Sequence, residues 1–584
     1  MRLLSLSLQG AYKGLKEQTF DLSDSQGQVI ALVGLNGSGK SQLLELIGEC
    51  FAFIERAQRR DFKVKKGLNF GFILEYQTHE PSNHSVGNPG MVCGGPLAQC
   101  GGVINPKYKV VLPVASKKLQ VFVNKQSKWV EIPLESLQLP RVIGYSSGLN
   151  ENLQRSFLKN ASQIYKALSV RSRRRKQLMR LQAEYRNRHD EESRDRLPML
   201  IQDVNERFLT RYPHLFEEDL TQVGTGDEMV EYINPLNLKE TYVYPSTHVY
   251  LDYDSAQLAI AALAILDDDL LVRALAGTTF NRPVKLVLEY DLKNWTIEEE
   301  LTKDIQKFIG DALPYNVTGL GRRTTDDEYE LYELDFLRGT IELDLYDPDV
   351  KRNLKQSNID SGLRMFERLY RIQQLGLKNL NAKVRSELNK GNYEGSVKKP
   401  LKAKLPLSVK ELILADESGR TVCFDDLSDG EAQLLQILAM TTLYRDEQTL
   451  FLYDEPETHL NPAWRTHFHS FLQQAMHTES PNSQVFLATH SPFMISSLKR
   501  ENVFMFHRCE DGTIDYRHPS NETYGASFDV LIKEHFGLHS LISQSVIEEI
   551  REQLKQGDSH ARQWIEAHLG KSPEKAYLMK KLAQ

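Results

Sequence analysis

A glycine-rich segment near the start of the chain has the residue types needed to hold a phosphate group. Residues 34–41 read GLNGSGKS, with Lys40 directly before Ser41. Glycines let a backbone wrap closely, so that its N–H groups point at phosphate oxygens. A lysine ammonium suits the β- and γ-phosphates of a nucleotide, and a serine hydroxyl can bind Mg²⁺. This spacing, with a strand before it and a helix after it, predicts a phosphate-binding loop.

Two adjacent carboxylates far along the chain could complete such a site. Asp454 and Glu455 follow the apolar run 450–453 (LFLY). An aspartate at the end of a buried strand can hold Mg²⁺, and the next residue can accept a proton from an attacking water. Alone, an apolar run that ends in Asp-Glu is an ordinary strand end. Paired with the phosphate loop, it predicts the catalytic half of the site.

Two shorter segments stand on either side of this pair. Residues 427–431 (LSDGE) begin 27 positions before Asp454, and Ser428 is placed to cap a helix that starts there. His490 follows the apolar run 485–488. A lone histidine at a strand end is usually structural, and a capping sequence is common. The order and spacing of all four segments narrow the class of protein far more than either short segment does alone.

The residues above need strands and helices that bring them together. The runs 29–33 (VIALV), 450–453 and 485–488 are continuous apolar stretches, typical of strands covered on both faces. Apolar residues with helical spacing predict a helix from Ser41 and another over about 431–444. Both ends of the chain therefore read as regular α/β structure.

The composition limits the class of protein. The chain has 584 residues, of which 41% are hydrophobic and 26% charged, and its net charge is −6. The length predicts several domains or one domain with a large insertion, and the charge excludes a chain that coats nucleic acid by bulk charge. The longest apolar run, 258–266, is roughly half of what a membrane span needs. Five scattered cysteines favour a cytoplasmic protein over a disulfide-linked one.

The middle of the chain is patterned in charge. Residues 155–188 have strong helical propensity and carry eleven Arg or Lys against Glu184 alone, whereas residues 298–349 are acidic. The basic stretch from Arg171 to Lys176 suits phosphate contacts with DNA or RNA. The alternative is a solvated helix face that pairs with the acidic region or with a partner protein.

The four segments together resemble the nucleotide-binding heads of the ABC ATPase superfamily. Residues 34–41 are similar to a Walker A loop, residues 427–431 to a signature motif and residues 450–455 to a Walker B strand. His490 is similar to the switch histidine. The resemblance implies an α/β fold, an ABC-type ATPase head with a mixed sheet and flanking helices.

The resemblance also implies a division of the chain. The head would comprise residues 1–80 and 405–510. Residues 81–404 would form a large, mostly helical insertion that contains the basic and acidic regions. Residues 511–584 would form a C-terminal helical segment for docking or assembly.

Heads of this superfamily pair head-to-tail around two ATP molecules with Mg²⁺. By resemblance, Glu455 is the general base, His490 contacts the γ-phosphate, and Lys40 is the third catalytic residue. Asp454 and Ser41 would hold Mg²⁺. The residues implied to bind ATP are Asn36, Gly37, Ser38, Gly39, Lys40, Ser41 and, from the second subunit, Ser428 and Gly430.

A glutamine after an early strand is expected as a further Mg²⁺ contact in such heads. Gln77 ends the apolar segment 72–77 and is the first candidate. Gln154 is the alternative, and the sequence does not choose between them. Asn461, in the segment after Glu455, corresponds to the loop that joins the two sites of a dimer.

The branch of the superfamily follows from the spacing. The 386 positions between Ser41 and Leu427 are too many for a transporter cassette and resemble the SMC, RecF and OLD-like group. Residues 145–151 and 522–529 look like the restriction-associated and PtuA-type ATPases of Septu and retron anti-phage systems. This implies a regulator of a separate HNH-type nuclease (PtuB-like), with or without a retron reverse transcriptase and its RNA or DNA. The alternative is a RecF- or SMC-like DNA-repair ATPase that acts directly on DNA.

No nuclease motif accompanies these segments in the sequence. OLD-family nucleases need an Asp-x-Asp pair in a C-terminal domain, and none follows His490. Asp347 and Asp349 have this spacing but lie in the acidic region. The sequence therefore predicts an ATPase without nuclease activity, in a head-to-tail dimer or larger even oligomer.

Overall fold

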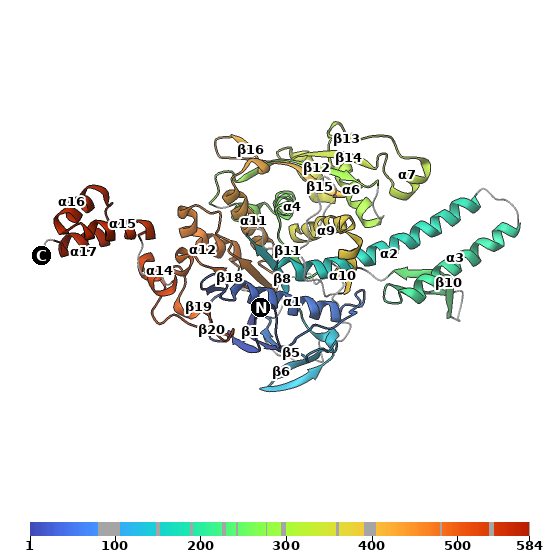
Figure 1. The fold of residues 1–584 in the computed structure, drawn as a ribbon. Helices are drawn as coiled ribbons and strands as arrows, with labels where there is room; N and C mark the ends of the chain where they lie inside the picture. The colour runs from blue at the N-terminus through green and yellow to red at the C-terminus, as the bar shows by residue number, and fades with distance from the viewer. Residues whose placement is uncertain are drawn as a thin grey trace.

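A computed structural model describes most of the chain. The residues described are 1–79, 105–147, 152–186, 191–224, 229–240, 243, 245–275, 277–293, 299–357, 361–390, 405–478, 482–536 and 542–582. They form a layered α/β body from which two helical segments project on opposite sides (Figure 1). None of the described helices is both long enough and apolar enough to cross a membrane.

The central sheet has the strand order β11-β8-β17-β18-β3-β19-β20. Neighbouring strands are parallel from β11 to β19, and β20 is antiparallel to β19. The strands are β3 (Val29–Val33), β8 (Arg141–Ser146), β11 (His248–Tyr250), β17 (Thr449–Asp454), β18 (Ser483–Thr489), β19 (Val503–Arg508) and β20 (Ile514–Arg517). Every residue of β3 and of β18 is buried, because both faces of the sheet are covered.

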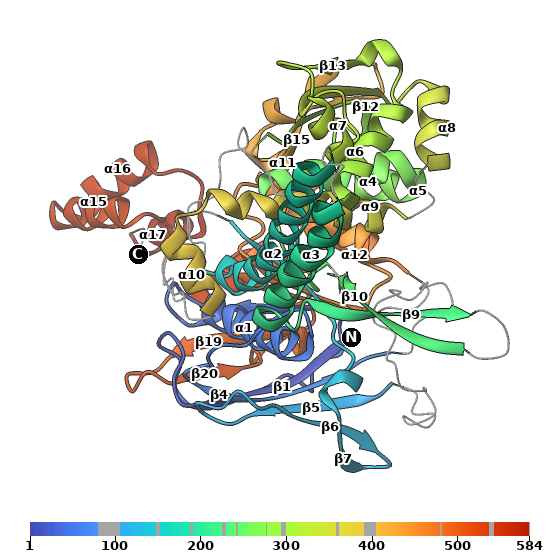
Figure 2. The same ribbon diagram turned by 90° about the vertical axis from the view of Figure 1, so that its right-hand side faces the viewer.

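One face of the central sheet is covered by α1 (Lys40–Gln58) and an antiparallel sheet of order β2-β1-β4-β5-β6-β7. Ile30 and Leu32 of β3 share a buried cluster with these elements. Figure 2 shows α1 between this sheet and the helices above it. The strands are β1 (Arg2–Gln9), β2 (Gln18–Asp21), β4 (Gly71–Gln77), β5 (Lys107–Leu112), β6 (Gln120–Lys125) and β7 (Lys128–Ile132).

The other face packs against helices and a further antiparallel sheet of order β13-β14-β12-β15-β16. Ala31 and Val33, which alternate with Ile30 and Leu32 along β3, belong to this second cluster. The strands are β12 (Arg282–Asp291), β13 (Val317–Gly319), β14 (Arg338–Asp344), β15 (Leu407–Ala415) and β16 (Thr421–Cys423). The helices are α4 (Tyr253–Leu266), α5 (Asp268–Ala274), α6 (Glu299–Asp311), α7 (Asp326–Tyr332), α8 (Pro348–Ser357), α9 (Gly362–Gln374), α11 (Asp429–Leu443), α12 (Pro462–Met476), α13 (Pro492–Ile495) and α14 (Phe528–Phe536). A further helix, α10 (Ala382–Lys390), packs in a separate small cluster with Leu158, Ala161 and Tyr165.

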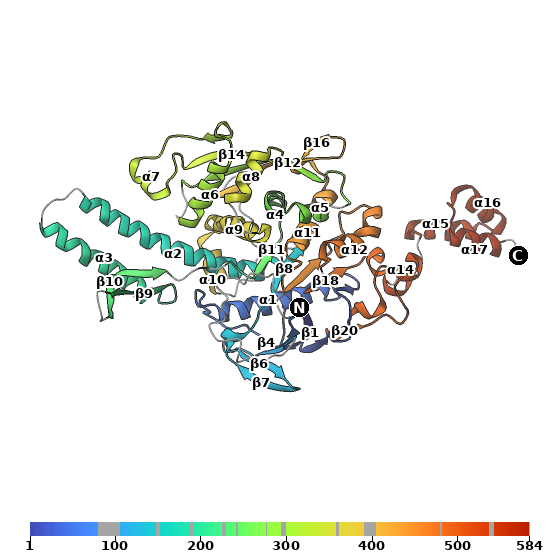
Figure 3. The same ribbon diagram turned by 180° about the vertical axis from the view of Figure 1, so that it is seen from behind.

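Two projections extend away from the layers. The first is an arm of α2 (Gln154–Arg186) and α3 (Glu191–Arg211), with the hairpin β9 (Phe216–Gly224) and β10 (Met229–Glu240) beside it. The second is a group of three helices, α15 (Gln544–Lys555), α16 (Asp558–His568) and α17 (Pro573–Lys581). Figure 3 shows the arm and this C-terminal group at opposite ends of the molecule.

Most elements predicted from apolar patterns are confirmed. The expected strands 29–33, 450–453 and 485–488 are β3, β17 and β18, and the expected helices are α1 and α11. The basic helical region corresponds to α2.

The predicted division of the chain needs correction. Strands β5 to β8 and β11 come from the range 81–404, yet they pair with strands of the two head sheets. That range also contributes β12, β13 and β14 to a sheet that it shares with β15 and β16, so it is not simply a helical insertion. β20, from the range 511–584, is an edge strand of the central sheet. These short strands have no catalytic motif in them, and only their pairing partners reveal where they belong.

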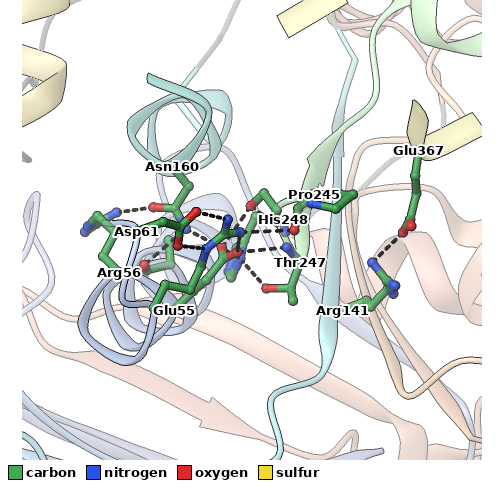
Figure 4. Close-up of polar contacts among 12 residues, drawn as sticks. Glu55, Arg56, Asp61, Arg141, Asn160, Pro245, Thr247, His248 and Glu367 are labelled. Atoms are coloured by element: carbon green, nitrogen blue, oxygen red, sulfur yellow. Dashed lines mark hydrogen bonds and ion pairs between the residues drawn. The ribbon is translucent and has the colours of Figure 1, made fainter. Parts of the chain in front are cut away.

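A buried polar cluster ties the end of α1 to the root of α2 and to β11 (Figure 4). The Glu55 carboxylate accepts hydrogen bonds from the Thr247 N–H at 2.9 Å, from His248 Nδ1 at 2.8 Å and from Asn160. Burial opposes ionisation of Glu55, but the hydrogen bonds from His248 and Thr247 and the positive charge of Arg59 together outweigh it. The pKa of Glu55 therefore lies well below its ordinary value. Arg56 donates to the Asn160 side chain at 2.8 Å. The cluster therefore fixes the helix after the phosphate loop relative to the arm.

Candidate functional site

The phosphate loop lies between the end of β3 and the start of α1. Gly37 and Gly39 have φ angles of 81° and 107°, in the left-handed region that favours glycine. A Cβ atom at Gly34 would come within 2.4 Å of the Phe506 carbonyl oxygen. No side chain caps the first turn of α1, so its backbone N–H groups can serve an anion. The loop therefore has the backbone shape that phosphate binding requires.

Lys40 is buried inside this loop. Its ammonium donates hydrogen bonds to the carbonyl oxygens of Gly34 at 2.7 Å and of Leu35 at 3.2 Å. Burial lowers the pKa of Lys40, while the negative charges of Glu455 and Asp454 act in the opposite direction. Phosphate oxygens would offer this ammonium charged partners in place of the carbonyls. Lys40 thus fits the predicted role of a phosphate contact.

Ser41 and Asp454 lie together beside the loop. The Ser41 hydroxyl donates a hydrogen bond of 2.8 Å to Asp454 Oδ1. Burial raises the pKa of Asp454 to about 6, although the hydrogen bond from Ser41 acts against this shift. Within the described residues, no three His, Cys, Asp or Glu side chains are grouped to hold a metal. Mg²⁺ commonly needs just one or two protein ligands when phosphates and water supply the rest, so this pair fits the ion.

Glu455 and His490 form the second pair of the site. His490 Nδ1 lies 3.1 Å from Glu455 Oε1, and His490 is exposed. This hydrogen bond lowers the pKa of Glu455 and raises the pKa of His490. An ionised carboxylate can accept a proton from water, and a protonated histidine can donate to a phosphate oxygen. The two side chains therefore place a carboxylate and an imidazole within hydrogen-bond distance of each other beside the loop.

The central sheet brings these residues together. Asp454, the last residue of β17, is paired with Ala488 of β18. β18 is in turn parallel to β3, whose end leads into the phosphate loop. Parallel strands meet at a common carboxyl edge, where ligands bind in open α/β sheets. Three of the four predicted segments, the loop, the Asp-Glu pair and His490, thus share one edge.

The fourth segment begins α11. Ser428 is exposed and caps the helix with a reciprocal pair of hydrogen bonds to Glu431. Gly430 is buried, and a Cβ atom there would come within 2.7 Å of the His459 carbonyl oxygen. Asn461 caps α12, where its side chain accepts from the Trp464 N–H. The start of α11 is therefore packed against the turn that follows Glu455.

The structure overturns the prediction that Gln77 binds the metal. Gln77 pairs with Arg2 at the start of β1, and the nearby His79 N–H donates to Gln448, just before β17. Asp454 is at the other end of β17, about 20 Å away at the usual rise per residue. β4 belongs to the second sheet, where it is antiparallel to β1, and it ends beside the start of β17 instead of the carboxyl end. The alternative, Gln154, begins α2 and is buried.

Sequence reasoning missed a set of polar contacts around the turn after Glu455. Gln433 of α11 donates to the Tyr145 hydroxyl at 2.8 Å and accepts from the His459 N–H at 3.2 Å. Ser147 and Thr458 hydroxyls are 2.9 Å apart. These contacts link α11, β8 and the turn. Gln433, like Gln436, is a polar residue within the apolar pattern of α11, and this is the available signal in the sequence.

The basic stretch from Arg171 to Lys176 is only partly available to a partner. Arg171 and Arg174 are each 8% exposed. Arg174 donates to Asn205 at 3.0 Å and pairs with Glu240 at 3.1 Å. Arg174 therefore joins α2 to α3 and β10, and the two buried arginines offer little surface for the predicted phosphate contacts. Arg173 and Lys176 are exposed.

Comparison with known proteins identifies a related family for part of the chain. Residues 325–496 match the family described as "AAA domain, putative AbiEii toxin, Type IV TA system". This range includes Ser428, Asp454, Glu455 and His490 and leaves out the phosphate loop. A search of curated proteins found no match.

Among solved structures, the chain is similar to two SMC head domains. One is the Smc head domain from Pyrococcus furiosus with an extended coiled coil, bound to the C-terminal domain of ScpA. The two chains share 12% sequence identity, the match covers 94% of this chain and 99% of that chain, and the TM-score is 0.29. The other is the SMC head domain from Thermotoga maritima. It shares 10% sequence identity with this chain, the match covers 89% of this chain and 100% of that chain, and the TM-score is 0.30.

Proposed function

We propose that this chain is an ABC-type ATPase, which hydrolyses ATP to ADP and phosphate. The observation that carries this proposal is the meeting of five side chains at one edge of the central sheet. They are Lys40, Ser41, Asp454, Glu455 and His490. Residues far apart in sequence supply a phosphate contact, a pair of metal-binding oxygens and an acid-base pair, which together are the parts that phosphoryl transfer to water needs.

Each of these side chains has a role that its surroundings support. Lys40 would neutralise the phosphates from inside the loop. Mg²⁺ held by Ser41 and Asp454 would neutralise charge on the phosphate oxygens. Glu455, whose pKa is lowered by His490, is ionised at neutral pH and would accept the proton of the attacking water. His490 would donate a hydrogen bond to the γ-phosphate.

The proposed unit is a head-to-tail dimer that encloses two ATP molecules. Its support is the position of Ser428, which is exposed at the start of α11 and caps that helix. In such a dimer Ser428 and Gly430 would act on ATP bound to residues 34–41 of the second subunit. A larger even oligomer would contain the same contact.

The wider role we propose is regulation of a separate HNH-type nuclease in anti-phage defence, with or without a retron reverse transcriptase and its nucleic acid. The resemblance of residues 522–529 to PtuA-type ATPases supports this role. The other segment with this resemblance is 145–151, and its residues 148–151 lie outside the described part of the chain. The matched family's description as a putative toxin is compatible with a two-part system. The arm and the C-terminal helices offer surfaces that stand clear of the ATPase layers.

A cleavage and turnover assay tests this proposal. The purified chain is incubated with Mg²⁺ or Mn²⁺, with and without ATP, on plasmid DNA and total RNA, and phosphate release is followed in parallel. We expect ATP turnover that Lys40→Ala abolishes, and no cleavage until an HNH partner is added. Cleavage by the chain alone would place a nuclease site within it and contradict the regulatory role.

A second candidate function, direct action on nucleic acid, is favoured by one observation. Lys166, Arg173 and Arg180 recur every seven residues on α2, which places them on one helix face over about 21 Å. Burial lowers the pKa of Lys166, and the positive charges of Lys65, Lys63 and Arg173 lower it further. Cations gathered from two segments form a surface suited to a phosphate backbone. We call these five residues the basic stripe.

Binding of labelled DNA or RNA at several salt concentrations tests the second candidate. The double variant Lys166→Gln/Arg173→Gln should weaken binding and reduce the salt slope by about one per lost phosphate contact. The control, Lys117→Gln/Lys118→Gln, removes the same charge from exposed positions between β5 and β6. Equal loss in both variants would mean that bulk charge, and not the basic stripe, is responsible.

A further inference from the structure

A buried carboxyl group next to the proposed catalytic residues has no part in the mechanism above. Glu457 lies in the turn after β17, two positions beyond Glu455, and is 2% exposed. Glutamates are almost never buried to this degree unless they have specific partners. The contacts of Glu457 therefore indicate what its carboxyl does.

The Glu457 carboxyl is joined to the strand end that carries His490. The Thr489 hydroxyl donates a hydrogen bond to Glu457 Oε1, and the Ser491 N–H donates to Thr489 Oγ1 at 3.0 Å. Thr489 and Ser491 are the residues directly before and after His490. The carboxyl of Glu457 thus anchors the backbone on both sides of the histidine.

Two more contacts join the same segments. The Glu455 N–H donates to the Ala488 carbonyl oxygen at 2.8 Å, and His490 Nδ1 meets Glu455 Oε1 at 3.1 Å. Glu455 has a φ of 52°, in the left-handed region, where a non-glycine residue stays only if its surroundings hold it. Because His490 is exposed, few neighbouring side chains restrict its position beside Glu455. The buried hydrogen bond from Thr489 to Glu457 restricts the backbone next to His490.

The charge of Glu457 also matters to its neighbours. Burial raises the pKa of Glu457 to about 7, and its Oε2 atom is buried without a hydrogen-bond partner among the described residues. The titratable groups that face it are Glu455, His490, Lys40 and Tyr145. A neutral carboxyl at Glu457 can accept the hydrogen bond from Thr489. An ionised carboxylate there would place a second negative charge beside Glu455 and would raise the pKa of Glu455.

We propose that Glu457 is a positioning residue that acts through Thr489 to hold His490 where its imidazole meets Glu455. The inference rests on the proposed ATPase function and adds to it the group that fixes the acid-base pair. Glu457 does not touch the reacting atoms itself. Its loss should therefore impair the chemical step and leave nucleotide binding largely intact.

Four variants separate this role from simple packing. Glu457→Ala and Thr489→Val each remove one partner of the buried hydrogen bond. Glu457→Gln keeps a neutral side chain that can accept it, and Thr489→Ser keeps the donor. We expect kcat for ATP to fall about tenfold or more in the first two, because a mispositioned acid-base pair loses much of its contribution. KM and the affinity for a fluorescent ATP analogue should change by less than about threefold, and the two conservative variants should stay close to wild type.

A second measurement does not depend on turnover. In protein labelled at histidine Cε1, with the His490 signal assigned through His490→Asn, NMR titration gives the pKa of His490. It should lie above the ordinary value in wild type and in Glu457→Gln, and should fall in Glu457→Ala as the contact with Glu455 loosens. Thermal unfolding shows whether each variant is folded.

The outcomes distinguish the two proposals. An unchanged kcat and an unchanged His490 titration in folded Glu457→Ala would overturn the positioning role. A wild-type chain that hydrolyses no ATP, yet whose His490 titration responds to Glu457→Ala, would contradict the proposed function and support the positioning role. Equal loss of kcat in Glu457→Gln and Glu457→Ala would show that the carboxyl acts in some other way and would also overturn the inference.

Discussion

Ser41 and Asp454 share a hydrogen bond of 2.8 Å although they are 413 positions apart in the chain. Ser41 lies in the first turn of α1 and Asp454 ends β17, so the contact joins two distant parts of the sequence at the carboxyl edge of the central sheet. Both oxygens are suited to Mg²⁺, and nothing in either segment alone would place them together. The proposed ATPase depends on this meeting point.

Asp454→Asn should weaken the metal dependence of the site. The substitution keeps the size of the side chain but removes a negative charge, so the Mg²⁺ concentration for half-maximal ATP turnover should rise at least tenfold. A Mg²⁺ titration of phosphate release checks this. Asp446→Asn, at an exposed position in the loop before β17, is the matched control and should leave the titration unchanged.

Glu455→Gln should separate nucleotide binding from hydrolysis. Glutamine cannot accept the proton of the attacking water, whereas Lys40, Ser41 and Asp454 are left in place. We expect turnover to fall by about a hundredfold or more, and ATP-bound dimers to accumulate in size-exclusion chromatography with light scattering. Wild-type turnover in this variant would show that another group is the base.

How far the sequence predicts this molecule depends on the signal that each element carries. β3, β17 and β18 could be predicted because they are uninterrupted apolar runs beside polar motifs, and Lys40, Asp454 and His490 because their spacing is distinctive. Gln77 was misplaced because an antiparallel sheet can return a strand end to either edge, and only the pairing of β4 with β1 decides which.

The partners of buried polar residues could not be predicted at all. Glu457 and Thr489 are 32 positions apart, and neither has a periodicity that indicates its partner. The same holds for Gln433 and Tyr145, which meet between α11 and β8. Such contacts depend on how whole layers pack, which a local pattern does not contain.

Gly430→Ala should destabilise the fold or weaken turnover through the turn after Glu455. The added Cβ would lie 2.7 Å from the His459 carbonyl oxygen, and overpacking of this kind costs about 1–3 kcal/mol. Gly310→Ala is a matched control, because Gly310 lies within α6 with nothing near its Cβ position. The control should be neutral or stabilising by up to about 1 kcal/mol, as measured by chemical unfolding. Equal stability of the two variants would refute the close contact at Gly430.

Stability should depend on pH through Glu457. Its pKa is about 7 in the folded chain against an ordinary value of 4.5, so the folded state keeps a proton that the unfolded state has released between these values. The resulting stabilisation is fully present below pH 4.5 and is lost as the pH rises through 7. Relative to Glu457→Gln, the unfolding free energy of wild type should fall by up to about 3 kcal/mol over this range. Parallel unfolding curves at pH 5 and pH 8 check it, and an identical pH dependence in both proteins would contradict it.

The central claim, an ATP site built from two subunits, is tested most directly by mixing two inactive variants. Lys40→Ala disables the phosphate loop and Ser428→Arg obstructs the start of α11, so each variant alone should lack ATP turnover. In an equal mixture, half of the dimers would be mixed and each would hold one intact site, which predicts recovery to roughly a quarter of the wild-type rate. No recovery between two folded, dimer-forming variants would contradict the composite site.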